Sequence, residues 1–395
     1  MKKFLLASVA GATLAAGAAS GEEVKLGIAF GFTGPLESMS PDMATSAEMA
    51  MTEVTDSGLL LDGSTVTPVR VDTTCADAAA AVTAVERIVT ADQVQGIVGG
   101  MCSGETIATL ERVGVPNGIV MISPSATSPA LTDIEDNGLF FRTSPSDARQ
   151  GEVMAELTLE RGIDTVAVSY TNNDYGKGLA DSFAAAFTAQ GGTVTMNAAH
   201  DDGKGDYSAE VAALASAGGD ALVLVGYVDQ GGAGILRGSL DSGAFSTFVF
   251  PDGMISQTLV ENFGPDLETS FGQSPSSEGE GRDRFNELAE AAGFDGGSQF
   301  AGESYDATAL ILLAMASAGS SDPSVYKDHV VEVANGPGEP ILPGELAKGL
   351  ELLVNGEAID YVGATGVELI GPGETAGTFR VLEFTGGTMN TIGYR

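Results

Sequence analysis

Residues able to bind a small charged molecule follow several predicted strands of this chain. Ser103 stands near the predicted start of a helix, and the hydroxyl-rich segment SPSATSP spans 123–129. Tyr175, Tyr227 and Asp252 follow three later apolar runs. Hydroxyl and backbone N–H groups bind a carboxylate, a carboxylate binds an ammonium group, and tyrosines offer aromatic faces. Together these residues complement a zwitterionic amino acid.

Each of these residues also has a simpler structural interpretation. Ser103 could be a helix N-cap, 123–129 an ordinary loop, and Asp252 a turn residue in Pro-Asp-Gly. Tyr175 and Tyr227 could be packed core residues. The interpretation as a binding site therefore depends on a fold that brings the ends of several strands together.

Motifs for catalysis are absent from the sequence. No P-loop, nucleophile elbow or zinc-protease motif occurs, and the glycines of 232–238 have the wrong spacing for a dinucleotide fingerprint. His200 and His329 are the two histidines, and neither belongs to a nucleophile–base motif. We expect a binding protein with no cofactor and no metal site. The rival, an exported hydrolase using Ser103 or Cys102, has no evident general base.

Charge and composition narrow the class of protein further. The 395 residues include 54 Asp+Glu against 18 Lys+Arg, a formal net charge of −36, so no basic surface is available for nucleic acid. Hydrophobic residues make up 43%, which excludes intrinsic disorder. The length is enough for two domains.

The N-terminus has the layout of a secretory signal peptide. Lys2 and Lys3 precede an apolar run over 4–14, and small residues follow, so that 1–20 is the predicted leader. The run is too short to span a membrane as a helix. We expect an exported, soluble protein.

Export bears on the two cysteines, Cys75 and Cys102. An oxidising compartment favours a disulfide between them, and a pair of free buried thiols is the alternative. A bridge closing a loop of this length stabilises a fold by about 3 kcal/mol.

Short apolar runs alternate with longer amphipathic ones along the chain. This alternation predicts an α/β fold with parallel sheets covered by helices on both faces. The rhythm restarts after 143–147, so two α/β units are expected, and the polar segment 273–283 is expected at the surface. A β-hairpin is predicted at the end. The predicted strands are 24–30, 66–71, 95–99, 118–122, 165–170, 193–197, 221–226, 247–250, 379–384 and 389–394.

The order and spacing of several short motifs resemble a known family. The sequence is similar to the leucine/isoleucine/valine-binding proteins of bacterial ABC importers, which are type I periplasmic binding proteins. This resemblance implies two doubly wound parallel-sheet lobes joined by three crossings. The motifs are GFTGP at 31–35, DTTC at 72–75, Cys102-Ser103, ISPSATSPALT at 122–132, YGKGL at 175–179, Gly226-Tyr227 and GILR at 234–237.

The resemblance also implies a role for each site residue. Ser103 and Thr127 would hold a ligand carboxylate, the backbone carbonyl of Ser125 would accept from the ammonium, and Asp252 would supply the counter-charge. Tyr175 and Tyr227 would close over the ligand from the second lobe, and Cys75–Cys102 would be a disulfide beside the site. Ala126, Cys102 and Met39 complete the predicted contact set. Asp252 stands where relatives carry Glu, and Met39 stands where they often carry an aromatic residue.

The predicted lobes are 21–143 with 276–365, and 144–275 with 366–395, with crossings near 141–145, 272–278 and 363–371. The predicted function is capture of a hydrophobic or branched-chain L-amino acid in the periplasm, by a monomer, for transient delivery to an ABC permease. Alternatives are an amide, urea or aromatic-acid ligand on the same fold, or an extracytoplasmic sensor.

Overall fold

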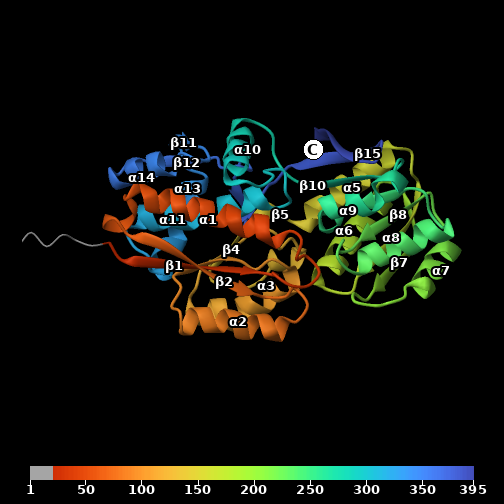
Figure 1. Cartoon of the computed structure of the whole chain (residues 1–395), viewed down its shortest axis with the longest axis horizontal. Helices are drawn as coiled ribbons and strands as arrows, with labels where there is room; N and C mark the ends of the chain where they lie inside the picture. Colours follow the sequence, from red (N-terminus) through yellow and green to blue (C-terminus); the bar gives the residue numbers. More distant parts are fainter. Residues whose placement is uncertain (1–20) are drawn as a thin grey trace, which may run out of the picture.

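A computed structural model describes residues 21–395, and the predicted leader over 1–20 lies outside the described residues. The chain forms two lobes side by side, each built on a seven-stranded sheet (Figure 1). The sheets are mostly parallel and are covered by helices, as predicted. In the described part of the chain, no helix is long and apolar enough to cross a membrane.

The first sheet has the strand order β13-β14-β5-β4-β3-β1-β2, and its pairs are parallel except β13–β14. Helices α1 and α11 pack together on one face, and α2 and α3 lie on the other (Figure 1). A small parallel sheet of β11 and β12 packs beside α13 and α14. The strands are β1 (Glu23–Phe30), β2 (Thr65–Asp72), β3 (Gly96–Gly99), β4 (Met121–Ser123), β5 (Phe140–Pro145), β11 (Glu339–Ile341), β12 (Ile359–Tyr361), β13 (Leu369–Ile370) and β14 (Glu374–Thr375). The helices are α1 (Ser40–Ser57), α2 (Ala78–Thr90), α3 (Ser103–Thr109), α4 (Val115–Asn117), α10 (Glu280–Ala292), α11 (Ala301–Ala318), α12 (Pro323–Tyr326), α13 (Val330–Ala334) and α14 (Leu346–Val354).

The second sheet has the order β16-β15-β10-β9-β8-β6-β7. Its first five strands in sequence pair in parallel, and the C-terminal hairpin of β15 and β16 adds two antiparallel strands at the β10 edge. The strands are β6 (Thr165–Thr171), β7 (Thr193–His200), β8 (Ala221–Val225), β9 (Phe248–Phe250), β10 (Phe271–Pro275), β15 (Phe379–Thr385) and β16 (Thr388–Tyr394). The helices are α5 (Asp147–Glu160), α6 (Asp174–Ala189), α7 (Ser208–Ala217), α8 (Gly231–Ser242) and α9 (Gln257–Phe263).

Both sheets share the doubly wound order 2-1-3-4-5 in their first five strands. The winding direction reverses between β1 and β3 in the first lobe and between β6 and β8 in the second. Ligands of such sheets bind beyond the carboxyl ends of the strands at this reversal. The strands there are mostly buried because helices cover both faces, and β3 (GIVG) and β8 (ALVLV) are apolar and fully buried. The fold therefore presents two sets of polar loops on rigid, buried strands.

Two predictions about the chain path need correction. The segment 273–283 was expected at the surface, but its first residues belong to β10, a fully buried strand between β9 and β15. The polar sequence of β10 hid the strand, since Ser274 accepts a hydrogen bond from Arg380 inside the fold. The assignment of 366–395 to the second lobe is also wrong for β13 and β14, which extend the first sheet at β5. The third crossing thus lies between β14 and β15, later than 363–371.

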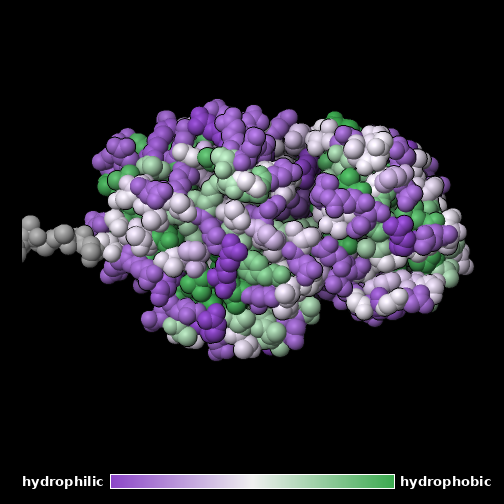
Figure 2. Space-filling view, in the orientation of Figure 1, coloured by the Kyte–Doolittle hydropathy of each residue, from purple (hydrophilic) through white to green (hydrophobic). Residues whose placement is uncertain are grey.

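The outer surface is mainly polar. The face in Figure 2 is mostly hydrophilic, with apolar residues in separate small groups. The exposed large hydrophobic side chains among the described residues are Val325, Val331, Val354, Ile370 and Ile392. Isolated residues of this kind are ordinary on a protein surface.

Candidate functional site

The first lobe supplies two loops that lie against each other at the end of the sheet. Ser103 begins α3 directly after β3, and Thr127 lies in the loop after β4; each is 1% exposed. The hydroxyl of Ser103 accepts a hydrogen bond from the backbone N–H of Ser128 at 3.1 Å. The hydroxyl of Ser125 donates to the carbonyl of Met101 at 2.9 Å. These bonds join the two loops into one polar wall.

A buried arginine anchors this wall from behind. Arg142, in the middle of β5, is 1% exposed and donates to the carbonyls of Ala126 (3.2 Å) and Ser128 (3.0 Å). Its charge is paired with Glu374 of β14. The late strand that the sequence analysis misassigned therefore holds the arginine that shapes the predicted ligand loop.

The second lobe contributes a tyrosine pair and a carboxylate. Tyr175 enters α6 and stacks on Tyr227, which follows β8, with ring centroids 5.3 Å apart. Tyr175 donates its hydroxyl hydrogen to Asp252 at 2.6 Å, and the Tyr227 hydroxyl accepts from the side-chain amide of Asn173. Burial raises the pKa of both tyrosines, so both remain neutral donors. The structure thus brings together the three second-lobe residues predicted from sequence.

A second buried carboxylate, missed by the sequence analysis, lies beside Asp252. Asp147 is the first residue of α5 and is fully buried; it accepts the hydroxyl hydrogen of Thr127 at 2.9 Å. Its Oδ1 has no hydrogen-bond partner. Burial, and then the charge of Asp252, raises the pKa of Asp147, and burial also raises the pKa of Asp252. Among the described residues neither carboxylate forms a salt bridge with a lysine, arginine or histidine.

Two buried carboxylates without a salt-bridge partner among the described residues can accept a positive charge in this part of the site. Buried charges in proteins are normally paired, and an ammonium group would pair with both carboxylates at once. A signal for Asp147 was present in the sequence, because it follows β5 just as Ser103 follows β3. It was overlooked because Ser, Pro and Asp over 143–147 are also typical of a linker.

The lobes lie in contact around these residues. On the rim of the cleft, the hydroxyl of Ser38 donates to Asp229 of the second lobe at 2.6 Å. Ser128 donates to the carbonyl of Asp174, at the start of α6, at 3.2 Å. Met39, adjacent to Ser38, is 6% exposed at the start of α1. The arrangement is a closed one, with the polar walls of both lobes facing inward.

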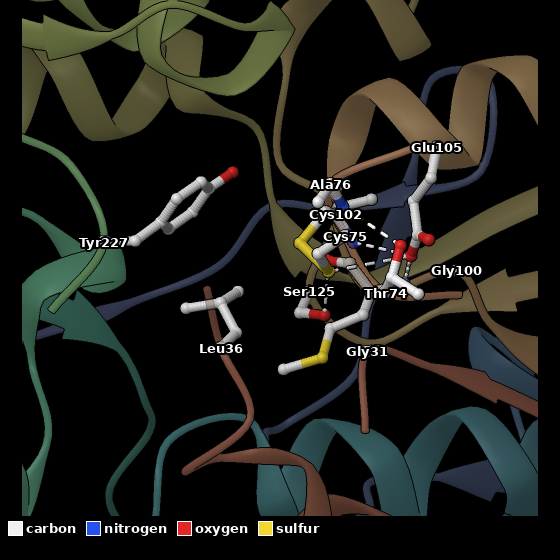
Figure 3. The surroundings of a disulfide bond; sticks show 12 residues. Gly31, Leu36, Thr74, Cys75, Ala76, Gly100, Cys102, Glu105, Ser125 and Tyr227 are labelled. Carbon is white, nitrogen blue, oxygen red and sulfur yellow. Dashed lines mark hydrogen bonds between the residues drawn. A yellow bond between two sulfur atoms is a disulfide. The ribbon is translucent and has the colours of Figure 1, made fainter. Parts of the chain in front are cut away.

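A disulfide joins two loops of the first lobe next to the cleft. Cys75 and Cys102 are bonded, with their Cα atoms 5.4 Å apart, in agreement with the expected pair. Leu36 and Tyr227 lie on one side of the bridge and Glu105 on the other (Figure 3). Leu36, which the sequence analysis did not single out, is 5% exposed. An apolar wall of disulfide, Leu36 and tyrosine ring thus adjoins the charged end of the site.

Between the lobes a cavity of about 360 Å³ lies beside the disulfide, next to the predicted ligand-contact residues and not lined by them. First-lobe loops and second-lobe loops both line it, including Cys75, Asn173, Asp201, Asp202 and Gln230. Two apposed doubly wound lobes with a polar cleft between them define a binding protein of the periplasmic class.

The chain belongs to the periplasmic binding protein family, whose model matches residues 23–333. It is 30% identical over 354 residues to Leu/Ile/Val-binding protein homolog 1 of Brucella suis, and the alignment covers 88% of this chain and 92% of that relative. It is 32% identical over 253 residues to the Leu/Ile/Val-binding protein BraC3 of Rhizobium johnstonii, and this alignment covers 63% of this chain and 65% of that relative. The resemblance drawn from the motifs is confirmed.

Solved structures show the same fold. The leucine-binding protein LivK of Thermotoga maritima matches with a TM-score of 0.79 at 22% identity, covering 94% of this chain and 98% of that one. LivJ of Streptococcus pneumoniae in complex with isoleucine matches with a TM-score of 0.77 at 22% identity, with the same coverage. A solute-binding protein of R. palustris in complex with 4-hydroxybenzoate matches with a TM-score of 0.76 at 16% identity, covering 95% and 97%. One architecture therefore serves ligands with and without an amino group.

Proposed function

We propose that the protein captures a hydrophobic, branched-chain L-amino acid between its two closing lobes and delivers it to an ABC permease. The observation that carries this proposal is the pair of buried carboxylates, Asp147 and Asp252, close to the hydroxyl-bearing loops of Ser103 and Thr127. A zwitterion pairs with both kinds of group, because its ammonium meets the carboxylates and its carboxylate meets the Ser103 hydroxyl and the backbone N–H donors of the two loops.

Capture and delivery of a ligand require a change of conformation and no chemical reaction. In the proposed cycle the ligand stabilises the closed form through contacts with both lobes, and closure is a shift between two conformations. The apolar wall of Leu36, Tyr227 and the Cys75–Cys102 disulfide would receive an aliphatic side chain. We also propose that Ala126 and Met39 contact the ligand, as predicted from the sequence. Export through the leader over 1–20 and a monomeric state belong to this proposal.

An aromatic carboxylate is the second candidate ligand. The stacked Tyr175–Tyr227 pair and the R. palustris relative bound to 4-hydroxybenzoate favour it. Such a ligand would leave Asp147 and Asp252 without a cation, and its own negative charge would add to theirs.

Calorimetric titration with L-leucine, L-isoleucine, L-valine, benzoate and 4-hydroxybenzoate distinguishes the two candidates. We expect micromolar or tighter binding of at least one aliphatic amino acid and none of the benzoates. In the variant D252N the preference should move away from the amino acid. Tight benzoate binding without amino-acid binding would establish the second candidate, and the absence of binding by the whole panel would refute the proposed substrate class.

Uptake of radiolabelled leucine by cells that lack this protein, with and without its restoration, tests delivery. Restoration that leaves uptake unchanged would favour a sensor over a transport protein.

A further inference from the structure

The loop that leads into Ser103 is held from beneath by a buried glutamate. Glu105 is 4% exposed, and its Oε1 accepts the backbone N–H of Met101 at 2.9 Å and of Cys102 at 3.1 Å. These are the last two residues before Ser103. The carboxyl of Glu105 therefore directs the backbone that presents Ser103 to the cleft.

The opposite side of the same loop is held by hydroxyl groups. Ser123 donates to the carbonyl of Gly100 at 2.6 Å, and Ser125 donates to the carbonyl of Met101 at 2.9 Å. The peptide groups on either side of Met101 are thus directed from both sides. A change in the charge of Glu105 acts on a rigid loop and is transmitted to the site as an electrostatic effect.

The groups around Glu105 shift its pKa in both directions. Burial, with a smaller contribution from the charge of Asp72, raises the pKa of this carboxyl to about 7. The hydroxyl of Thr73 and the backbone N–H groups of Met101 and Cys102 lower it. The disulfide beside it, with Cys75 Sγ 3.9 Å from Oε1, carries no charge. Its Oε2 and the hydroxyl of the neighbouring Thr73 both lack a well-formed hydrogen bond among the described residues, and this hydroxyl can accept from Oε2 once a proton is added there.

We propose that Glu105 is a positioning residue that couples ligand binding to proton uptake. When a ligand carboxylate settles on the Ser103 side of the cleft, Glu105 takes up one proton from the solvent at Oε2, and no other bond changes. Oε1 continues to accept the two N–H groups, so the loop keeps its shape while the like-charge repulsion disappears. The inference rests on the proposed function, because it requires an anionic group at Ser103.

Two other carboxylates respond to the ligand in the opposite direction. The ammonium group would favour the ionised forms of Asp147 and Asp252, which would release protons on binding. The net proton count of the native protein therefore mixes both effects. The difference between the native protein and a variant without the Glu105 charge isolates the proposed one.

The test is calorimetric titration of the mature chain with L-leucine at pH 7 in phosphate and in Tris, whose ionisation enthalpies differ. The variant E105Q keeps an oxygen acceptor for both N–H groups and cannot titrate. If ligand binding raises the pKa of Glu105 by one unit, the native protein should take up about 0.4 proton more per ligand than E105Q. The same coupling makes native affinity about 5-fold tighter at pH 6 than at pH 8, relative to E105Q.

Equal proton counts in the native protein and E105Q would overturn the proposal. Glu111, an exposed glutamate just beyond α3, provides the control, since E111Q should match the native protein. If E105Q fails to fold, D72N takes its place: it should lower the pKa of Glu105 and move the pH of maximal proton uptake to a lower value than in the native protein, and an unchanged pH profile of uptake would overturn the proposal. No binding of leucine, isoleucine or valine at any pH would instead refute the proposed function.

Discussion

Replacing one buried carboxylate should move ligand affinity and stability in opposite directions. In D252N the side-chain oxygen can still accept from Tyr175 (2.6 Å) and from the N–H of Gly253 (2.8 Å), so the local geometry should survive. The loss is one negative charge beside the ligand ammonium. A charge pair at 4 Å is worth about 4 kcal/mol at an effective dielectric constant near 20. Since Asp147 remains, we expect a net loss of about 2–3 kcal/mol, or roughly 30- to 150-fold in the leucine Kd.

Without ligand, the same variant should be more stable than the native protein. Burial raises the folded-state pKa of Asp147 and Asp252 above the unfolded value of about 3.9, so their ionised forms destabilise the fold at neutral pH. Their contribution to stability therefore rises as the pH falls through the folded-state pKa toward the unfolded one. D252N should raise the ligand-free Tm at pH 7 and show a smaller gain on acidification.

Calorimetric titration with leucine gives the Kd, and scanning calorimetry from pH 4 to pH 8 gives the Tm. The exposed Asp241 on α8 is the matched control, and D241N should leave both quantities unchanged. Leucine binding in D252N as tight as in the native protein would refute the assignment of this carboxylate to the ammonium. A lower ligand-free Tm in D252N would refute the claim that the ionised carboxylates destabilise the fold in the absence of ligand.

The rim contact, the disulfide and the buried arginine each give a further prediction. S38A removes the hydrogen bond to Asp229 that only the closed form makes, at a cost of about 1 kcal/mol, so stopped-flow release of leucine should be roughly 5-fold faster; unchanged release would show that the bond does not hold the lobes together. The double variant C75A/C102A should lower the free energy of unfolding in guanidinium by about 3–4 kcal/mol through loop entropy, and an unchanged transition midpoint would contradict this estimate. R142M leaves its half-buried partner Glu374 uncompensated and removes the donors to the ligand-loop carbonyls, so unfolding should be easier by about 3 kcal/mol; a loss below 1 kcal/mol would show that the ion pair is dispensable.

The sequence was sufficient where a local pattern matched a local structure. Apolar runs and their following polar residues located the strand ends that carry Ser103, Tyr175, Tyr227 and Asp252, because a parallel sheet brings its carboxyl ends to one edge. The family resemblance supplied the pairing of two distant sets of loops. Contacts between ligand and site residues remain predictions.

The sequence was insufficient where polar residues are buried by tertiary partners. The polar strand β10 resembles a surface loop until the partner of Ser274, Arg380, is known from the far end of the chain. Glu374 pairs with Arg142 from more than 230 positions away, and no local period indicates such a contact. Asp147 lies in 143–147, which has the composition of a linker, and its contact with Thr127 of the first lobe has no local sequence signal.

The distribution of charge between the lobes explains how a ligand could close them. Both carboxylates, Asp147 and Asp252, begin or precede elements of the second lobe, whereas the hydroxyl wall of Ser103 and Thr127 belongs to the first. A ligand with only one charge would pair with the polar groups of one lobe and leave those of the other lobe unpaired. A zwitterion pairs with both, so its contacts exist in full only when the lobes are together, and differential contacts of this kind are what shift a population toward closure.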